Sequence, residues 1–192
     1  MKLAIFGGSF DPPHQGHAKI IETFWQLYPK TSKLYFIPNR ISPFKTEKAL
    51  NASQTLEICQ LFLQGLPGYN EIWQGELQKT GKSYTIDTVE ELQKKHPNNT
   101  FYLLIGSDNA QSIHTWKDFA RIQEVCEIIV FRRPGSLDAI HSYKTLTNPV
   151  LDASSSEIRR QLQQGEKPQY LSSQVYQYIL NRGLYATTDS PR

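Results

Sequence analysis

A glycine-rich segment with two histidines holds the residues whose types and spacing are best suited to chemistry. It reads Gly7-Gly8-Ser9-Phe10-Asp11-Pro12-Pro13-His14-Gln15-Gly16-His17. The two glycines let a backbone approach a phosphate closely and present its N–H groups. His14 and His17 are three residues apart, so on a helix they share a face from which both imidazoles can donate hydrogen bonds to phosphate oxygens. This combination favours a nucleoside triphosphate as the ligand.

Each part of this segment also has a simpler interpretation. Two glycines can form an ordinary turn, and a histidine pair can lie on a solvated surface, but their joint position favours the phosphate site. Asp11, His14 and His17 could instead bind zinc, although no Cys or His close by supplies a fourth ligand. Two familiar nucleotide motifs fail: the segment lacks the further glycines of a dinucleotide loop, and Gly81-Lys82-Ser83 follows Gly75 at the wrong spacing for a phosphate loop.

The elements that must position these residues follow from the hydrophobic pattern. Short apolar runs alternate with longer segments of helical period, as in βα units that feed a parallel sheet. We expect strands at 2–6, 33–37, 100–105 and 127–131, with weaker strand signals at 71–74 and 150–151. We expect helices at 16–28, 53–62, 84–95, 154–163 and 173–181. A turn and a polar segment follow the strand at 100–105.

Local signals fix some of the element ends. Ser154 to Glu157 forms a Ser-x-x-Glu capping box, and Gly183 is placed to end the last helix. The predicted fold class is α/β, a Rossmann-like doubly wound parallel sheet with helices on both faces and a helical C-terminal segment. The glycine-rich segment then follows the first strand, at the sheet edge where such folds bind ligands.

The composition predicts one folded domain. Of the 192 residues, 39% are hydrophobic and 20% are charged, which is enough apolar material for a core. Without an internal repeat or linker, we expect a single domain over 1–185 and a frayed tail over 186–192. The net charge of +3 includes no basic run longer than a pair, so we expect no nucleic-acid partner.

The sequence predicts a cytoplasmic protein without a membrane partner. The first apolar run covers only 3–6, and no stretch of eighteen apolar residues follows. Cys59 and Cys126 lie far apart in apolar-periodic segments, which indicates buried thiols in a reducing compartment rather than a disulfide. The oligomeric state is not readable, because no helix shows a second apolar face.

Several motifs together resemble a known enzyme family. The first segment is similar to the Gly-x-Phe-Asp-Pro-x-His-x-Gly-His signature of the nucleotidylyltransferase superfamily. Further motifs, in family order along nearly the whole chain, resemble those of bacterial nicotinate mononucleotide adenylyltransferases. They are Ile37-Pro38-Asn39 with Pro43 and Lys45, Ser83-Tyr84-Thr85 with Asp87-Thr88, Gly106-Ser107-Asp108, Trp116, Arg132-Arg133-Pro134-Gly135, and Ser154-Ser155-Ser156 with Ile158-Arg159.

The resemblance implies a reaction and its participants. The family transfers the adenylyl group of ATP to nicotinate mononucleotide, giving deamido-NAD and pyrophosphate in NAD biosynthesis. ATP is then the co-substrate, and phosphate chemistry adds a divalent cation, Mg²⁺, bound mainly through phosphates. The attacking phosphate is already ionised, so catalysis needs positioning and charge neutralisation rather than a general base.

The resemblance also assigns roles to individual residues. Those expected to act on the reacting phosphates are His14, His17, Lys45 and Arg159. Those expected to complete the ATP site are Gly7, Gly8, Ser9, Phe10, Gly106, Asp108, Arg133, Ser155 and Ser156. The acceptor site is expected to use Asn39, the backbone N–H groups of Tyr84 and Thr85, and the ring of Trp116 stacked on the pyridine.

For some of these residues, the sequence is also consistent with a purely structural role. Lys45 could be a solvated surface lysine, Trp116 a core residue, and Asp108 the cap of the following turn. Ser154 can cap its helix while Arg159 still reaches a phosphate, and only one of Arg132 and Arg133 need face the site.

The chain also departs from the family pattern. Phe44 stands where the family commonly has His, Thr55 and Ile58 replace an Arg and a Met, and Ser156 replaces a Thr. These changes bear on the rate and on the acceptor preference. Two alternative functions therefore stand beside the first: an adenylyltransferase for nicotinamide mononucleotide or phosphopantetheine, and a non-catalytic nucleotide-binding module.

Overall fold

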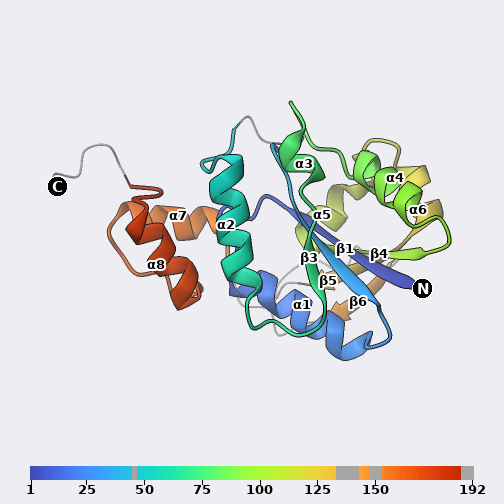
Figure 1. The fold of residues 1–192 in the computed structure, drawn as a ribbon, viewed down its shortest axis with the longest axis horizontal. Helices are drawn as coiled ribbons and strands as arrows, with labels where there is room; N and C mark the ends of the chain where they lie inside the picture. Colours follow the sequence, from blue (N-terminus) through green and yellow to red (C-terminus); the bar gives the residue numbers. More distant parts are fainter. Residues whose placement is uncertain (45–46, 133–142, 148–152, 187–192) are drawn as a thin grey trace.

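A six-stranded parallel sheet forms the centre of the molecule. The structure is a computed structural model, and it describes residues 1–44, 47–132, 143–147 and 153–186. The sheet lies between helices (Figure 1). Its strands lie in the order β3-β2-β1-β4-β5-β6, and every neighbouring pair is parallel. Their bounds are β1 Lys2–Gly8, β2 Lys33–Pro38, β3 Asn70–Ile72, β4 Thr100–Gly106, β5 Cys126–Arg132 and β6 Lys144–Thr147. This order and direction confirm the predicted doubly wound sheet.

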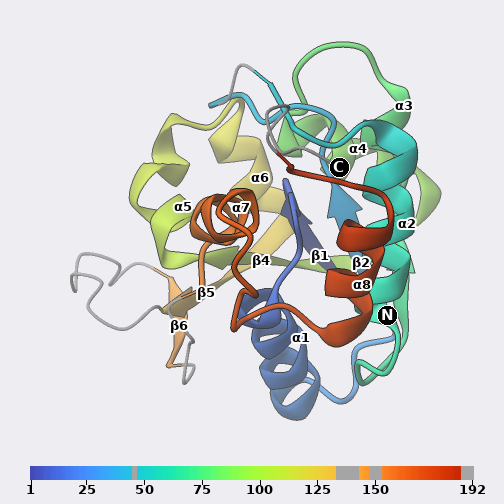
Figure 2. The same ribbon diagram turned by 90° about the vertical axis from the view of Figure 1, so that its left-hand side faces the viewer.

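Helices cover both faces of the sheet. One layer holds α1 (Gln15–Leu27), α2 (Ala52–Leu63), α7 (Ser155–Gln163) and α8 (Ser173–Asn181). The other holds α4 (Thr85–Lys95), α5 (Ser107–Ser112), the 3₁₀ helix η1 (Ile113–Thr115) and α6 (Phe119–Val125). The short helix α3 (Gly75–Gln78) lies between β3 and α4 in the chain. Figure 2 shows the C-terminal helices α7 and α8 beside α1 and α2, as expected for a helical C-terminal segment.

The two layers follow from the alternation of side chains along each strand. On β1, Ala4 and Phe6 belong to the core cluster of the α1 layer, whereas Leu3 and Ile5 belong to the cluster of the α4 layer. Successive strand residues point to opposite faces, so a strand covered on both sides must be apolar throughout. This is why the predicted central strands appear in the sequence as continuous apolar runs.

Most predicted elements are confirmed to within one or two residues at each end. Ser154 caps α7 by accepting a hydrogen bond from Glu157 N at 3.3 Å, and Gly183 has the left-handed φ of +58° that ends α8. The carboxylate of Glu157 instead pairs with Arg160. Only half of the predicted capping box therefore forms.

Other expectations need correction. The segment after β4, expected to be a turn and a polar stretch, contains α5, η1 and α6. The strand expected at 71–74 is β3, at 70–72, and β6 was not predicted at all. The strand expected at 150–151 and the tail over 187–192 lie outside the described residues. The missed or shifted elements α5, η1, α6, β3 and β6 are too short to show a clear hydrophobic period in the sequence.

Candidate active site

The loop that joins β1 to α1 takes its shape from one buried aromatic ring. Phe10 is 1% exposed, and its ring stacks on that of Phe36 with the ring centres 3.9 Å apart. A Cβ added at Gly8 would lie 2.8 Å from the Phe10 ring, so glycine is required there. Phe10 has a φ of 46°, which is uncommon for an aromatic residue and is held by this packing. The side chain of Phe10 therefore shapes the loop, in addition to lining the site.

The two histidines lie together at the start of α1. Their ring centres are 3.8 Å apart and their planes are inclined by 25°. The backbone N–H of His14 donates to Nδ1 of His17 at 3.2 Å. Because Nδ1 accepts, the proton of a neutral His17 ring lies on Nε2, which can donate to a ligand. A Cβ at Gly16 would come within 3.0 Å of the His14 ring, so glycine also leaves room for the pair.

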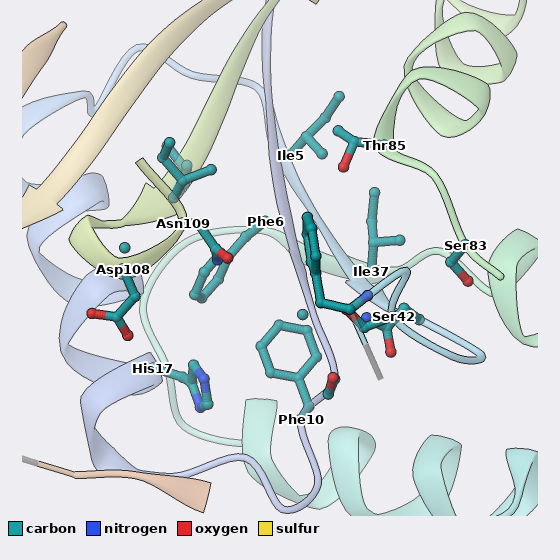
Figure 3. A pocket seen from close by; sticks show the side chains of 18 of the residues that line it. Ile5, Phe6, Phe10, His17, Ile37, Ser42, Ser83, Thr85, Asp108 and Asn109 are labelled. Atoms are coloured by element: carbon teal, nitrogen blue, oxygen red, sulfur yellow. The ribbon is translucent and has the colours of Figure 1, made fainter. Parts of the chain in front are cut away.

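A cavity of about 510 Å³ opens at the carboxyl ends of the central strands, within the usual size range of small-molecule sites. It lies at β1 and β4, where the strand order reverses, as ligand sites do in this fold. Both histidines line it, although His14 is only 3% exposed. Figure 3 shows His17 and Asp108 on one side of the cavity and Ser83 and Thr85 on the other.

The cavity brings together most of the predicted site residues. From the expected ATP site it collects Gly7, Gly8, Ser9, Phe10, Gly106, Asp108, Ser155 and Ser156. From the expected acceptor site it collects Asn39, Tyr84, Thr85 and Trp116. Lys45 and Arg133 lie outside the described residues, so their roles stay predictions.

Arg159 is the one described site residue that does not line the cavity. Its Nη1 donates to the carbonyl oxygen of Asp11 at 2.6 Å, and its Nη2 donates to Ser156 Oγ at 3.3 Å. Ser155 Oγ donates to the carbonyl of Pro12 at 2.9 Å. Hydrogen bonds from Ser155 and Arg159 thus connect α7 to the loop between β1 and α1.

The start of α4 forms the opposite wall. Tyr84 is the extended N-cap residue and Thr85 begins the helix, so the first N–H groups of α4 have no partner within the helix. Trp116 packs against the core cluster of this layer and is half-buried, so it is both a packing residue and a cavity residue. Among the described residues, its indole Nε1 has no hydrogen-bond partner. A helix N-terminus and an indole face are suitable for a carboxylate and a flat ring, respectively.

Glu76 is a cavity residue that the sequence analysis missed. It is 7% exposed on the short helix α3, and it accepts a hydrogen bond from Thr88 Oγ1 at 2.7 Å. Burial raises the pKa of Glu76, while hydrogen bonds from Thr88 and Ser83 act in the opposite direction. Ser83 Oγ also accepts from Arg40 N at 3.0 Å, so this cluster joins α3, α4 and the loop after β2. A lone glutamate in a four-residue helix gives no sequence signal for such burial.

Lys117 was missed too, although it follows the predicted Trp116. Its Nζ lies 2.9 Å from Asp87 Oδ1 and 5.1 Å from the centre of the Tyr84 ring. The hydrogen bond with Asp87 raises the pKa of Lys117. The acceptor wall therefore carries a cation that is held in place from the first turn of α4.

The zinc interpretation of the first motif does not agree with the structure. The carboxylate of Asp11 accepts hydrogen bonds from Tyr185 Oη at 2.7 Å and from Ala49 N at 3.1 Å. Across the described ranges, no group of three or more His, Cys, Asp or Glu side chains could hold a metal ion.

Comparison with known proteins gives consistent results. Residues 5–161 match the family described as cytidylyltransferase-like. A protein of Leptospira interrogans named probable nicotinate-nucleotide adenylyltransferase is 40% identical over 190 residues, which cover 95% of this chain and 96% of that protein. A protein of Geobacillus thermodenitrificans with the same name is 35% identical over 195 residues, covering 98% and 88%, respectively.

Solved structures show the same fold. A Plasmodium falciparum nicotinic acid mononucleotide adenylyltransferase in complex with NaAD aligns with a TM-score of 0.78 at 22% identity, covering 96% of this chain and 97% of that one. A Vibrio parahaemolyticus protein described as a putative nicotinate-nucleotide adenylyltransferase aligns with a TM-score of 0.73 at 21% identity, covering 97% and 96%, respectively.

Proposed function

Because the chain belongs to the cytidylyltransferase-like family, and within it to the nicotinate-nucleotide adenylyltransferases, we propose that it joins ATP and nicotinate mononucleotide to form deamido-NAD and pyrophosphate, a step of NAD biosynthesis. One observation of the site supports this best. A single cavity has stacked imidazoles at the start of one helix and, across it, the open N-terminus of another helix beside an indole. The first wall suits phosphates, and the second suits a pyridine carboxylate.

The chemistry requires the chain to hold and neutralise anions. A phosphate oxygen of nicotinate mononucleotide attacks the α-phosphorus of ATP, forming a new P–O bond. The bond from the α-phosphorus to the bridging oxygen breaks, and the electron pair leaves with pyrophosphate. His17 Nε2–H and the His14 ring donate toward the departing phosphates, whose negative charge grows in the transition state. The backbone of Gly7 and Gly8 lets those phosphates come close.

The acceptor side orients the nucleophile. We assign the carboxylate of the nicotinate ring to the N–H groups at Tyr84 and Thr85, and the ring itself to the face of Trp116. The Lys117 ammonium lies at this wall as the cationic member of an ion pair with Asp87. Together these groups favour an acceptor that carries a carboxylate over one that carries a neutral amide.

A divalent cation is part of the proposal. Mg²⁺ keeps several waters and commonly binds through substrate phosphates and one or two carboxylates. The described residues fit this mode, because Asp108 is a carboxylate on the phosphate side of the cavity. When bound, the cation supplies charge neutralisation at the phosphates.

The setting of the reaction is proposed on separate grounds. In the described part of the chain, no helix combines the length and the hydrophobicity that a membrane span requires. Both cysteines are free, as is usual in a reducing compartment, and we place the protein in the cytoplasm. Its partners in this proposal are the two nucleotides, without nucleic acid.

Pyrophosphate release tests the proposal. With ATP and Mg²⁺, we expect release with nicotinate mononucleotide to exceed release with nicotinamide mononucleotide, and phosphopantetheine to give none. A preference for either of the other acceptors would overturn the acceptor assignment. No release with any acceptor, together with measurable ATP binding, would indicate a nucleotide-binding module instead.

A further inference from the structure

We propose that Tyr185 is a positioning residue for adenylyl transfer, which acts through the buried carboxylate of Asp11 to hold the Arg159 guanidinium against Ser156 at the edge of the cavity. The inference rests on the adenylyl transfer proposed above. It assigns a kinetic role to the end of the described chain, a residue far from the cavity motifs in sequence.

The contacts of Asp11 carry the argument. Asp11 is buried, and each of its carboxylate oxygens accepts from a different part of the chain. Oδ1 accepts from Tyr185 Oη at 2.7 Å, across 174 residues of sequence, and Oδ2 accepts from Ala49 N at 3.1 Å. Arg159 Nη1 lies 3.9 Å from Oδ2 and donates to the Asp11 carbonyl at 2.6 Å. A buried carboxylate is stable only when such partners satisfy it.

The position of Asp11 links these contacts to the reaction. It directly follows Phe10, whose ring meets the His17 ring edge-to-face with the ring centres 4.9 Å apart. Asp11 also faces Arg159, which donates a hydrogen bond to Ser156 on the cavity wall. Any shift of the Asp11 carboxylate is therefore transmitted to the loop that shapes the phosphate site and to a guanidinium at its edge.

Removal of the Tyr185 hydroxyl would leave Oδ1 without its donor. Among the described residues, Arg159 is the cation that lies within 4 Å of this carboxylate, and a partly buried guanidinium is strongly attracted to an unsatisfied carboxylate. We infer that Arg159 would turn toward the carboxylate and away from Ser156. The guanidinium would then leave Ser156, the cavity residue through which it lies next to the proposed ATP site.

The backbone conformation and the packing of Tyr185 hold its hydroxyl in this contact. Its φ of 64° lies in the left-handed region, which is costly for a bulky residue and is held by the surrounding contacts. Its ring packs against the core cluster of the α1 layer. Burial, and then the negative charge of Asp11, raise the pKa of Tyr185 well above its usual range, so the phenol remains a donor.

The main test is Tyr185→Phe, which keeps the ring and removes the donor. Tyr178→Phe is the matched control, because Tyr178 Oη donates to Glu57 Oε2 at 3.0 Å, a contact between α8 and α2 that does not involve the loop. For each purified variant we would measure the melting temperature, kcat, and KM for both substrates. We expect Tyr185→Phe to lower kcat/KM for ATP about tenfold while KM for nicotinate mononucleotide changes less than about twofold. Tyr178→Phe should leave all kinetic constants unchanged.

A double-variant cycle tests the route through Arg159. In an Arg159→Lys background, Tyr185→Phe should reduce kcat/KM for ATP by less than about twofold further, because the guanidinium it positions is gone. A full tenfold loss in both backgrounds would overturn the coupling. Unchanged kinetics of Tyr185→Phe, with or without a lower melting temperature, would overturn the positioning role. An inactive parent enzyme would instead contradict the proposed function itself.

Discussion

At the scale of single residues, the site works with hydrogen-bond donors whose orientation is fixed by their neighbours. The backbone N–H of His14 donates a hydrogen bond to Nδ1 of His17. In the neutral ring, the proton of His17 therefore lies on Nε2. The Phe10 ring supports His17 from the side at 4.9 Å between ring centres. A donor that is already oriented stabilises developing charge without reorganisation cost. The two imidazoles therefore act as a unit rather than as two independent phosphate ligands.

This arrangement predicts the effect of His17→Ala. Loss of one oriented donor at the departing pyrophosphate should lower kcat by about 10²- to 10³-fold. The protein should still fold with a modestly lower melting temperature, because His17 is half-buried and its ring supplies one capping acceptor, for His14 N. Pyrophosphate release and thermal melting measure the two effects. His114→Ala is the control, since His114 is exposed and does not line the cavity, and it should retain normal turnover. Normal turnover in His17→Ala would show that the reacting phosphates lie elsewhere.

At the scale of elements, the connection between β1 and α1 depends on one steric requirement. Gly8 lies where the Phe10 ring folds back, and the backbone of Gly8 accepts a hydrogen bond from Asn39 N at 2.9 Å. The ring thus packs tightly against a position that lacks a side chain. The loop cannot open there without removing Phe10 from its stack on Phe36.

Two glycine variants test this requirement. In Gly8→Ala the new methyl group would lie 2.8 Å from the Phe10 ring, so we expect a loss of about 1 to 3 kcal/mol in the free energy of unfolding and a large loss of activity. In Gly7→Ala the nearest atom to the methyl group is the Ile37 carbonyl oxygen at 3.9 Å, an ordinary contact. The two variants are compared by urea unfolding. Equal stability of Gly8→Ala and Gly7→Ala would contradict the role given to Phe10.

The elements also show what a sequence can predict. α1, α2, α4 and α8 span nine to thirteen residues, long enough for a hydrophobic period to appear, and they were predicted closely. α5 and α6 have six and seven residues, and their helical state depends on packing against β4 and β5. The cavity motifs were predicted because they are local in sequence. The contacts of Glu76 with Thr88 and of Asp11 with Tyr185 were not, since they join parts of the chain that no local pattern relates.

At the scale of the whole molecule, the sheet separates two cores. Cys59 lies in the cluster of the α1 layer, and Cys126 lies in the cluster of the α4 layer, so each thiol reports on one face. The C-terminal helices belong to the first layer, with Val175 and Ile179 in the same cluster as Cys59. The layer of α1, which carries the two histidines, therefore includes the C-terminal helices α7 and α8. The start of α4, which forms the acceptor wall, belongs to the other layer.

This division predicts the reactivity of the two thiols. Burial raises the pKa of both Cys59 and Cys126 to about 12, so near pH 8 almost no thiolate is present and neither is accessible. In the native protein we expect neither to react with a maleimide over minutes, and in denaturing urea we expect both to react. Mass spectrometry at intermediate urea then reports on each layer separately. If the protein unfolds as one cooperative unit, both thiols become reactive at the same urea concentration. Earlier labelling of Cys59 would show that the α1 layer, with its C-terminal helices, opens on its own, and rapid labelling of either thiol without urea would contradict the packing described here.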